Sequence, residues 1–368
     1  MSYNNLYGGG EDLYLIAIFI FIYIFQALLL GGRKKYNRLL FLLSFIGLQI
    51  ISGFKIPIEG DSEYYADLFV EVSKTSFKDL FDIGIEKGFL IFFWLLSFIC
   101  KTPQGMIFWV SAIMNILVLR YINKHSEIKW LSLVLYVTLM YFFNAMNLFR
   151  FALAYTILLY SNKFIIKRQF LRFTAFCLIA ASFHVSVLLY LILYFVAPLN
   201  LNIKNMAIIA IPAIILMSSF ASVFGLVIQF HDRFSAYGSD GEFYQSAIAN
   251  VLMAIESGLV VLFCLIKNRR SKRPIDDFMK LGLWSLFISF IFALFAVRVM
   301  ILIRFATLFS LISIIVIPNT IARTKTSSGS YWSWAFLFVF VTILKTTVIL
   351  SYRPEWYFVV YKNLLLHL

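Results

Sequence analysis

Four side chains that could take part in chemistry lie at the ends of long apolar runs or within an irregular one. Arg150 lies at the junction of two runs, Arg298 and Arg304 flank five apolar residues, and His184 lies within an irregular apolar stretch. Arginine is costly in hydrocarbon, and its planar fork matches phosphate or carboxylate oxygens. A histidine can take the proton of a hydroxyl group. Together they predict a site that holds an anion beside a reacting hydroxyl.

Each of these side chains also has a plainer interpretation. Arg150 could extend along the protein surface to the polar edge of the membrane. A histidine among apolar residues is commonly a hydrogen-bonded core residue. Arg298 and Arg304 are six residues apart and so lie on different faces of a helix, which leaves Arg304, at the start of a new apolar run, as the stronger candidate.

A stretch rich in acids supplies the carboxylates. Asp61 and Glu63 form an acid-x-acid pair that could hold a divalent cation, although acids in such a stretch are usually only solvated. Glu86 precedes a short apolar segment, where its carboxylate could orient an acceptor hydroxyl. Tyr64 and Tyr65 could stack on sugar rings, with an interfacial aromatic role as the ordinary alternative.

Composition places these residues in a membrane protein. Of the 368 residues, 62% are hydrophobic and 14% charged, and the mean hydropathy is +0.88. These values predict one integral membrane domain over residues 1–368. The formal net charge of +14 does not indicate nucleic-acid binding, because the basic residues sit in short loops between apolar runs.

Runs long enough to cross a bilayer predict an all-α, polytopic fold with about 11 to 14 transmembrane helices. The predicted spans are 13–30, 38–54, 105–122, 130–147, 148–166, 206–228, 247–266, 279–297, 303–319 and 331–350. Residues 89–100 are too short for a span. Residues 170–198 are too long for one span and short for two.

The distribution of Lys and Arg predicts the orientation. Basic clusters at 33–38, 167–172, 267–273 and 323–325 are expected in the cytoplasm, which places an acidic loop at 55–88 and a second loop at 229–246 outside. This arrangement requires 89–100 to re-enter or lie at the interface, and 170–198 to form a hairpin with His184 at its external tip. Irregular backbone at membrane depth must be buried or line a cavity, so both segments point to an outward-facing cavity.

Cofactor motifs are missing from the sequence. It holds no P-loop, dinucleotide fingerprint, His-Glu-x-x-His zinc motif or nucleophile elbow, and no cofactor is expected. Cys100, Cys177 and Cys264 lie far apart in apolar segments, as small buried hydrophobic residues do.

Taken together, several short motifs resemble the EpsG/Wzy-type polysaccharide polymerases. In chain order they are Asp61-x-x-Tyr64, Glu86-x-Gly88-Phe89, Asn147-x-x-Arg150-x-x-x-Ala154, Ala181-Ser-Phe-His184-x-Ser186 and Arg304-Phe305. Each motif is short, and the ordered combination over about residues 55 to 320 carries the specificity. One departure is Phe151, where the family often has glutamine.

The resemblance implies a metal-independent glycosyltransferase of GT-C-like architecture in the bacterial inner membrane, active on its periplasmic face. It would join oligosaccharide repeat units carried on undecaprenyl diphosphate. Arg150, Arg298 and Arg304 would bind the diphosphate, and His184 or Glu86 would activate the acceptor hydroxyl. The expected partners are the lipid-linked donor and acceptor, membrane lipid and a chain-length regulator protein, with no nucleic acid.

Three other functions remain open from the sequence. A metal-dependent glycosyltransferase would use polyprenyl-phosphate sugars, with Asp61 and Glu63 as metal ligands. A flippase for lipid-linked oligosaccharides would line a central path with charges, whereas the cations here gather near one face. A membrane acyltransferase could use His184 as its base, but no companion acid stands beside that histidine in the sequence.

Overall fold

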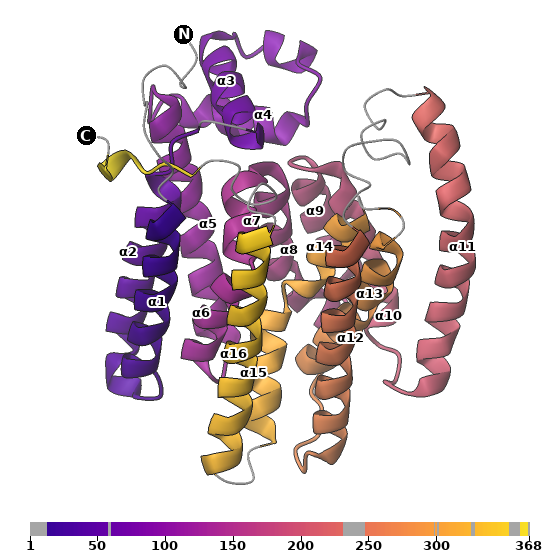
Figure 1. Ribbon diagram of the computed structural model, residues 1–368. Helices are drawn as coiled ribbons and strands as arrows, with labels where there is room; N and C mark the ends of the chain where they lie inside the picture. The colour runs from indigo at the N-terminus through magenta and orange to yellow at the C-terminus, as the bar shows by residue number, and fades with distance from the viewer. Residues whose placement is uncertain are drawn as a thin grey trace. The chain divides into compact units, whose positions relative to one another are not determined.

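The structure is a computed structural model that describes residues 13–57, 60–230, 247–297, 299, 302–324, 328–352 and 361–366. These residues form helices and no strand, apart from one isolated bridge between Lys55 and Asn363 (Figure 1). The α-helices are α1 (Leu13–Leu30), α2 (Asn37–Gly53), α3 (Gly60–Lys74), α4 (Lys87–Leu96), α5 (Pro103–His125), α6 (Lys129–Thr138), α7 (Tyr141–Asn147), α8 (Phe149–Ile166), α9 (Phe170–Ala181), α10 (Ile192–Val196), α11 (Ile203–Phe230), α12 (Ala247–Arg270), α13 (Asp277–Ala296), α14 (Leu302–Ser310), α15 (Ser313–Arg323) and α16 (Ser328–Tyr352).

The predicted all-α membrane fold is confirmed. Four of the described helices are long and apolar enough to cross a bilayer: α2 with its preceding turn, α5, α12 and α13. Two bent pairs, α6 with α7 and α14 with α15, raise the number to six if each pair is one span. This is fewer than the 11 to 14 spans predicted, since other apolar helices, such as α9, have only 10–17 described residues.

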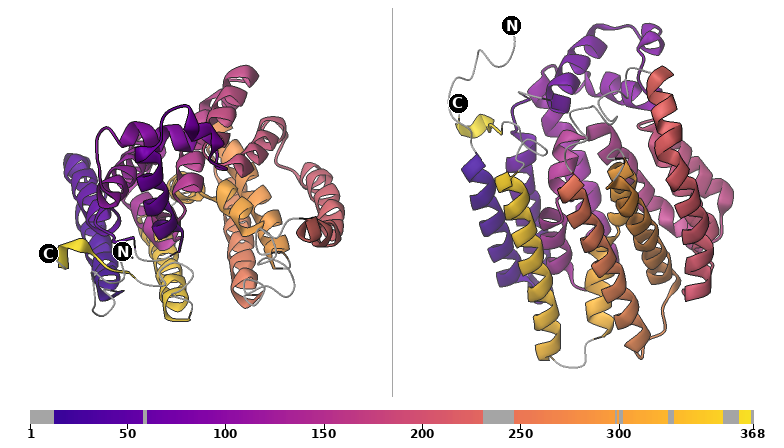
Figure 2. Two further views of the ribbon diagram at one scale, coloured as in Figure 1. Left: turned by 90° about the horizontal axis from the view of Figure 1, so that it is seen from above. Right: turned by 45° about the vertical axis from the view of Figure 1, so that its right-hand side comes forward.

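The chain divides into two compact units. The first comprises Met1–Tyr160, Leu178–Val185 and Lys325–Leu368, and the second comprises Ser161–Cys177 and Ser186–Thr324. In the first unit α1, α2, α5, α6 and α16 lie side by side, with α3 and α4 at one end of this group (Figures 1 and 2). The prediction of a single membrane domain stays a prediction.

Polar side chains fix the register of helices α2 and α5. Asn115 is buried and donates to Gln49 Oε1 and to Ser52 Oγ, at 3.1 Å in each case. Gln49 in turn donates to the carbonyl of Phe108 at 2.9 Å. Hydrogen bonds of this kind hold helices together in a membrane, where apolar contact alone is hardly better than contact with lipid.

The predicted span 130–147 is broken in the structure. Helices α6 and α7 meet at an angle of 51°, and Met140 between them has a left-handed φ of 69°. A left-handed residue ends the regular hydrogen-bond ladder of a helix. Thr346 of α16 donates to the carbonyl of Thr138 at 2.8 Å. This backbone carbonyl at the end of α6 therefore has a hydrogen-bond partner despite the break. A hydropathy window cannot detect such a break, because both halves are apolar.

The acidic stretch 55–88, predicted as a loop, contains helix α3. Tyr65, Phe69 and Val72 are buried at helical spacing, and Asp61 and Glu63 occupy the first turn. Acids near a helix N-terminus are favourable because the helix dipole is positive there. The side of the membrane on which this segment lies stays a prediction. Of the second predicted loop, residues 231–246 lie outside the described residues.

In the second unit, the chain folds back on itself between residues 168 and 195. Arg168 donates to the carbonyl of Tyr194 at 2.5 Å and stacks over its ring, which also contacts Phe170 and Phe173. This is the hairpin predicted for 170–198, with α9 as its first arm and a 3-10 helix (Val185–Leu191) and α10 as its second. The residues of its turn, which include His184, belong to the first unit.

Helix α13 packs against α12 and α14 in the same unit. Ser285 and Ser289 of α13 are buried and donate to the carbonyls of Phe309 and Ala306 in α14, at 2.6 Å and 2.8 Å. These bonds satisfy side chains that could not meet water at that depth. The bend of 42° between α14 and α15 interrupts the predicted span 303–319.

Candidate active site

An arginine–carboxylate pair forms the centre of the candidate site in the first unit. Arg150 Nη1 donates to Glu86 Oε2 at 2.7 Å, and the two side chains are 25% and 21% exposed. Arg150 Nε donates to Tyr65 Oη at 3.3 Å. Arg150 Nη2 has no protein acceptor among the described residues. The guanidinium group therefore keeps donors for a further oxygen ligand.

Aromatic packing sets the position of this arginine. The Tyr65 ring is buried and stacks on Phe149 with centroids 5.3 Å apart, and it meets Phe89 edge-on at 5.6 Å. Arg150 lies over the same Tyr65 ring, 5.8 Å from its centroid. Since these rings come from α3, α4 and α8, the three helices converge on one rigid support for the guanidinium group.

Glu86 is the residue immediately before α4, and both its carboxylate oxygens are engaged. Oε2 accepts from Arg150, and Oε1 accepts from the backbone N–H of Val185 at 3.2 Å. Partial burial works to raise the pKa of Glu86, but hydrogen bonds to backbone N–H groups and the positive charges of Arg150 and His184 outweigh it and lower that pKa. Glu86 is therefore a stable anion and a weak base in this state.

Close backbone contact joins the start of α4 to the turn that carries His184. Phe89 N donates to the carbonyl of Ser182 at 3.1 Å. A Cβ atom at Gly88 would stand 2.0 Å from Ser182 Oγ and 2.8 Å from the Ser182 carbonyl oxygen. Gly88 is needed because any side chain there would push this turn away.

His184 lies in the turn between α9 and the following 3-10 helix. Its ring is half-buried and meets the edge of Phe151 with centroids 5.4 Å apart. Its backbone N–H donates to the carbonyl of Ala180 at 3.2 Å, which closes the turn. Because its charge acts on Glu86, His184 belongs to the same group of side chains as Arg150 and Tyr65.

Two more of the predicted site residues lie on α3. Tyr64 is 47% exposed and contacts the Tyr65 ring at 5.7 Å, so it presents an open aromatic face. Asp61 is exposed in the first turn, and its charge acts on the buried ammonium of Lys55. Asp61 therefore lies beside the candidate site with its carboxylate accessible to solvent.

Of the other two predicted arginines, one lies in the second unit and one lies outside the described residues. Arg304 lies in the first turn of α14 in the second unit, half-buried, next to an apolar group formed by Ala296, Val299 and Leu302. Arg298 lies outside the described residues. Binding of an anion by Arg298 and Arg304 stays a prediction.

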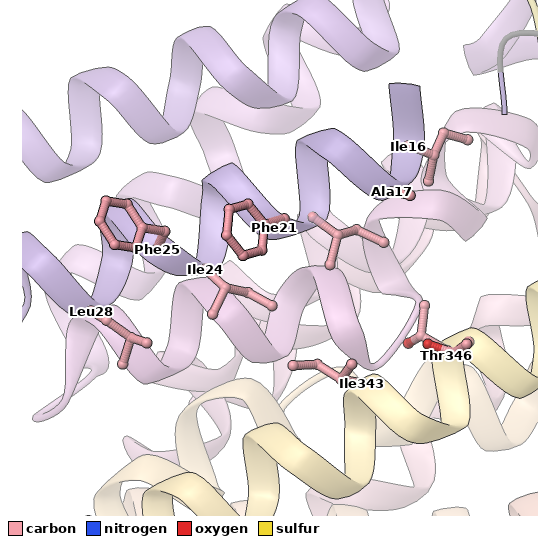
Figure 3. Close-up of a pocket in the computed structure, with 10 residues that line it drawn as sticks. Ile16, Ala17, Phe21, Ile24, Phe25, Leu28, Ile343 and Thr346 are labelled. Carbon is pink, nitrogen blue, oxygen red and sulfur yellow. The ribbon is translucent and has the colours of Figure 1, made fainter. Parts of the chain in front are cut away.

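Two further features of the described residues bear on what the site could bind: the absence of a metal cluster, and an apolar groove away from the site. Within the described part of the chain, no group of three or more His, Cys, Asp or Glu side chains could hold a metal ion. A groove of about 520 Å³ lies between α1 and α16, with a lining that is apolar except for Thr346 and Thr347 (Figure 3). Its lining suits a hydrocarbon chain and includes none of the predicted site residues.

Sequence reasoning missed two features that shape the site. Lys55 is buried and bonded to Asn147, and Ser182 packs against Gly88. A lone lysine at the end of an apolar run normally reaches for water, so its position gave no sign of burial. The signal that could have found Lys55 is its basic charge in a stretch otherwise dominated by acids.

The fold and this cluster define a class: an all-helical, multi-pass membrane protein with a partly open arginine–glutamate–tyrosine group and a nearby histidine. The chain matches the model of the EpsG family over residues 38–363 and belongs to that family. No curated protein and no solved structure matches it. Membership of the EpsG family indicates a polymerase-type role in polysaccharide biosynthesis.

Proposed function

We propose that the protein is a glycosyltransferase that joins oligosaccharide repeat units carried on undecaprenyl diphosphate. The observation that carries this proposal is Arg150, a partly exposed guanidinium group with donors to spare, fixed on a rigid aromatic support. A leaving diphosphate gains negative charge as its bond to the sugar breaks. A preorganised cation at that position stabilises the transition state. The N-terminus of α8 adds positive partial charge beside it.

In the proposed reaction, a hydroxyl of the acceptor sugar attacks the anomeric carbon of the donor. The bond from that carbon to the diphosphate oxygen breaks, and its electron pair stays on the diphosphate. The proton of the acceptor hydroxyl passes to a base. Both oxygens of Glu86 already accept hydrogen bonds and the pKa of Glu86 is low, which favours His184 as the base.

Glu86 then acts mainly by orienting its neighbours. It binds Arg150 through one oxygen and the N–H of Val185, the residue after His184, through the other. Tyr64, with its exposed ring, would stack on a sugar of the acceptor, and Asp61 would accept hydrogen bonds from sugar hydroxyls. Arg298 and Arg304 would supply further contacts to the diphosphate.

We place the reaction on the periplasmic face of the bacterial inner membrane. The support is the clustering of Lys and Arg in loops between spans, which predicts that the acidic segment with Asp61 and Glu86 lies outside. The partners in this proposal are the lipid-linked donor and acceptor, the surrounding membrane lipid and a chain-length regulator protein.

Reconstitution of the purified protein in liposomes with its cognate lipid-linked repeat unit tests the proposal. We expect a ladder of polymers on a gel, formed equally well in EDTA, and its loss in Arg150→Ala. Arg172→Ala, an exposed arginine bonded only to Gln169 in the described structure, is the control and should keep the ladder.

A ladder that disappears in EDTA and returns with a divalent ion would instead support the metal-dependent glycosyltransferase, with Asp61 and Glu63 as ligands. No ladder, combined with movement of the lipid-linked substrate across the bilayer, would support the flippase. Either result would overturn the proposal.

A further inference from the structure

Lys55 is a buried cation that the proposed chemistry does not use. It lies two residues beyond the end of α2 and is 4% exposed. Its Nζ donates to Asn147 Oδ1. Burial lowers the pKa of Lys55 to about 8, and the nearby charge of Asp61 works in the opposite direction. A buried ammonium group is unfavourable unless hydrogen bonds satisfy it, so the surrounding structure must hold it in place.

The backbone around Lys55 is held by a segment more than 300 residues further along the chain. Ile56 N donates to the carbonyl of Lys362 at 2.9 Å, and Leu364 N donates to that of Phe54 at 2.8 Å. These bonds flank the bridge between Lys55 and Asn363. The segment 361–366 is therefore attached to the end of α2 on both sides of the lysine.

Side chains of the same segment cap α2. Tyr361 Oη donates to the carbonyl of Ile51 at 3.0 Å, and Asn363 Nδ2 donates to that of Ile50 at 2.9 Å. The last carbonyls of a helix lack partners within the helix, and here remote side chains supply them. Both side chains are buried, at 0% and 1% exposure, so this contact is a fixed part of the first unit.

On its other side, Lys55 is connected to the candidate active site through Asn147. Asn147 is the last residue of α7, and Arg150 lies in the first turn of α8. Leu148 alone separates the two helices. Any shift of Asn147 is therefore passed almost directly to the start of α8, which carries the Arg150 guanidinium group.

We propose that Lys55 is a positioning residue for Arg150, acting through Asn147 and held in place by the segment 361–366. This inference rests on the proposed function, because it assumes that the placement of Arg150 determines the rate. A misplacement of about 1 Å far from the chemistry can cost about a hundredfold in rate.

A double-mutant cycle with the reconstituted full-length enzyme tests the proposal. In Lys55→Met we expect kcat/KM for polymer formation to fall about tenfold or more. In an Arg150→Lys background the same substitution should have a much smaller effect, because the guanidinium group that it misplaces is already gone. A purely structural role would give equal fold losses in both backgrounds.

The matched control is Lys129→Met. Lys129 also donates to an asparagine, Asn123 Oδ1 at 2.8 Å, but this pair is exposed on the first unit. We expect its kcat/KM to stay within about twofold of wild type, as for most surface changes. If Lys55→Met does not fold, Asn147→Leu takes its place in the double-mutant cycle. This substitution removes the acceptor of the Lys55 hydrogen bond.

The outcomes separate this inference from the proposed function. Full activity in Arg150→Ala overturns the proposed function, and the positioning role with it. Loss of activity in Arg150→Ala together with a folded Lys55→Met enzyme of wild-type kcat/KM overturns the positioning role alone. Equal fold losses in the two arms of the cycle would also overturn it.

Discussion

Two arginine–carboxylate pairs, each with an N–O distance of 2.7 Å, serve different ends in this protein. Arg150 and Glu86 in the first unit are 25% and 21% exposed. In the second unit Arg323 Nη1 meets Asp276 Oδ2, and the Arg323 side chain is only 4% exposed. Arg323 Nη2 also donates to the carbonyl of Pro274. The two N–O distances agree, but the Arg150 guanidinium group is accessible to solvent and the Arg323 guanidinium group is nearly closed off from it.

The contacts of the second pair are structural. Asp276 caps α13 by accepting from the N–H of Met279 at 2.8 Å, and Arg323 ends α15. Ser271 donates to the carbonyl of Arg323 at 3.1 Å, which attaches the loop before α13 to the same point. A closed pair holds a loop, whereas a partly open pair on a rigid support can bind a ligand. Solvent access to the arginine, 25% exposed in one pair and 4% in the other, separates the two roles, and distance does not.

The largest expected effect is the loss of activity in Arg150→Ala. Removing one preorganised donor to developing charge typically costs about a hundredfold to a thousandfold in rate. We expect that loss in kcat for polymer formation, with little change in Tm, because the pair is partly solvated. Rate assays and thermal unfolding of the same purified samples measure both quantities. A large fall in Tm would show that Arg150 has a structural role, and the two arginine–carboxylate pairs would then no longer differ in function.

Arg323→Met should show the opposite pattern. Breaking a buried pair typically destabilises a protein by about 3 to 5 kcal/mol, since the remaining groups lose their partners. Here the exposed Asp276 can return to water, so we expect about 2 to 3 kcal/mol, seen as a lower Tm. Specific activity of the folded fraction should stay near wild type, as should both quantities in Lys272→Met, an exposed neighbour. Lost specific activity at normal Tm would contradict this assignment.

Gly88→Ala tests the comparison in another way, because it disturbs the surroundings of the Arg150–Glu86 pair without changing a charge. The new Cβ would clash with Ser182 Oγ and with the Ser182 carbonyl oxygen. Overpacking of this kind typically costs about 1 to 3 kcal/mol, and it should separate Glu86 from Val185 and lower kcat. Ser182→Gly in the same chain should restore part of the activity, but not all, because the carbonyl contact remains. Wild-type kinetics in Gly88→Ala would show that the close contact is unimportant.

The smallest effect concerns pH. The pKa of Glu86 is lowered in the folded protein, so the stability it contributes is present above the ordinary value of 4.5 and is lost as pH falls through the lowered value. We expect wild type to lose less than about 1 kcal/mol more than Glu86→Gln in this acid range, because solvent screens the pair. The measurement is Tm against pH.

The same titration bears on the base. Glu86 stays ionised throughout the pH range in which histidines ordinarily titrate, about 5 to 8. A fall in kcat/KM on the acid side of that window should therefore persist in Glu86→Gln and disappear in His184→Gln. Persistence in the histidine variant would remove His184 from the role of base.

Much of the fold could be predicted from sequence because the signals are local. Apolar runs predicted the ends of α2, α5, α8 and α13 to within three residues. The hairpin at 170–198 was predicted because this stretch is too long for one span and short for two. The break at Met140 could not be predicted, since a left-handed residue leaves no mark on hydropathy. Helix α3 was overlooked because its many acids obscured the spacing of Tyr65, Phe69 and Val72.

Which residues form the candidate site could be predicted better than how those residues are arranged. Residue types at or near the ends of apolar runs indicated Arg150, Glu86 and His184, and the aromatic residues of the acidic stretch added Tyr64 and Tyr65. The hydrogen bond from Arg150 to Tyr65 and the contact between Gly88 and Ser182 depend on residues about 85 and 94 positions apart. Contacts between residues so far apart along the chain depend on tertiary packing, which cannot be predicted from a single sequence.

The attachment of segment 361–366 to the end of α2 has a consequence for biosynthesis. Tyr361 and Ile51 are separated by 310 residues. A ribosome builds about 5 to 20 residues per second, so α2 waits at least about 15 seconds for these caps after it has entered the membrane. During that interval the N–H of Ile56 and the carbonyls of Ile50 and Ile51 must find other partners. A chain that stops before residue 361 would never acquire these bonds, and quality-control proteases would meet it with the end of α2 uncapped.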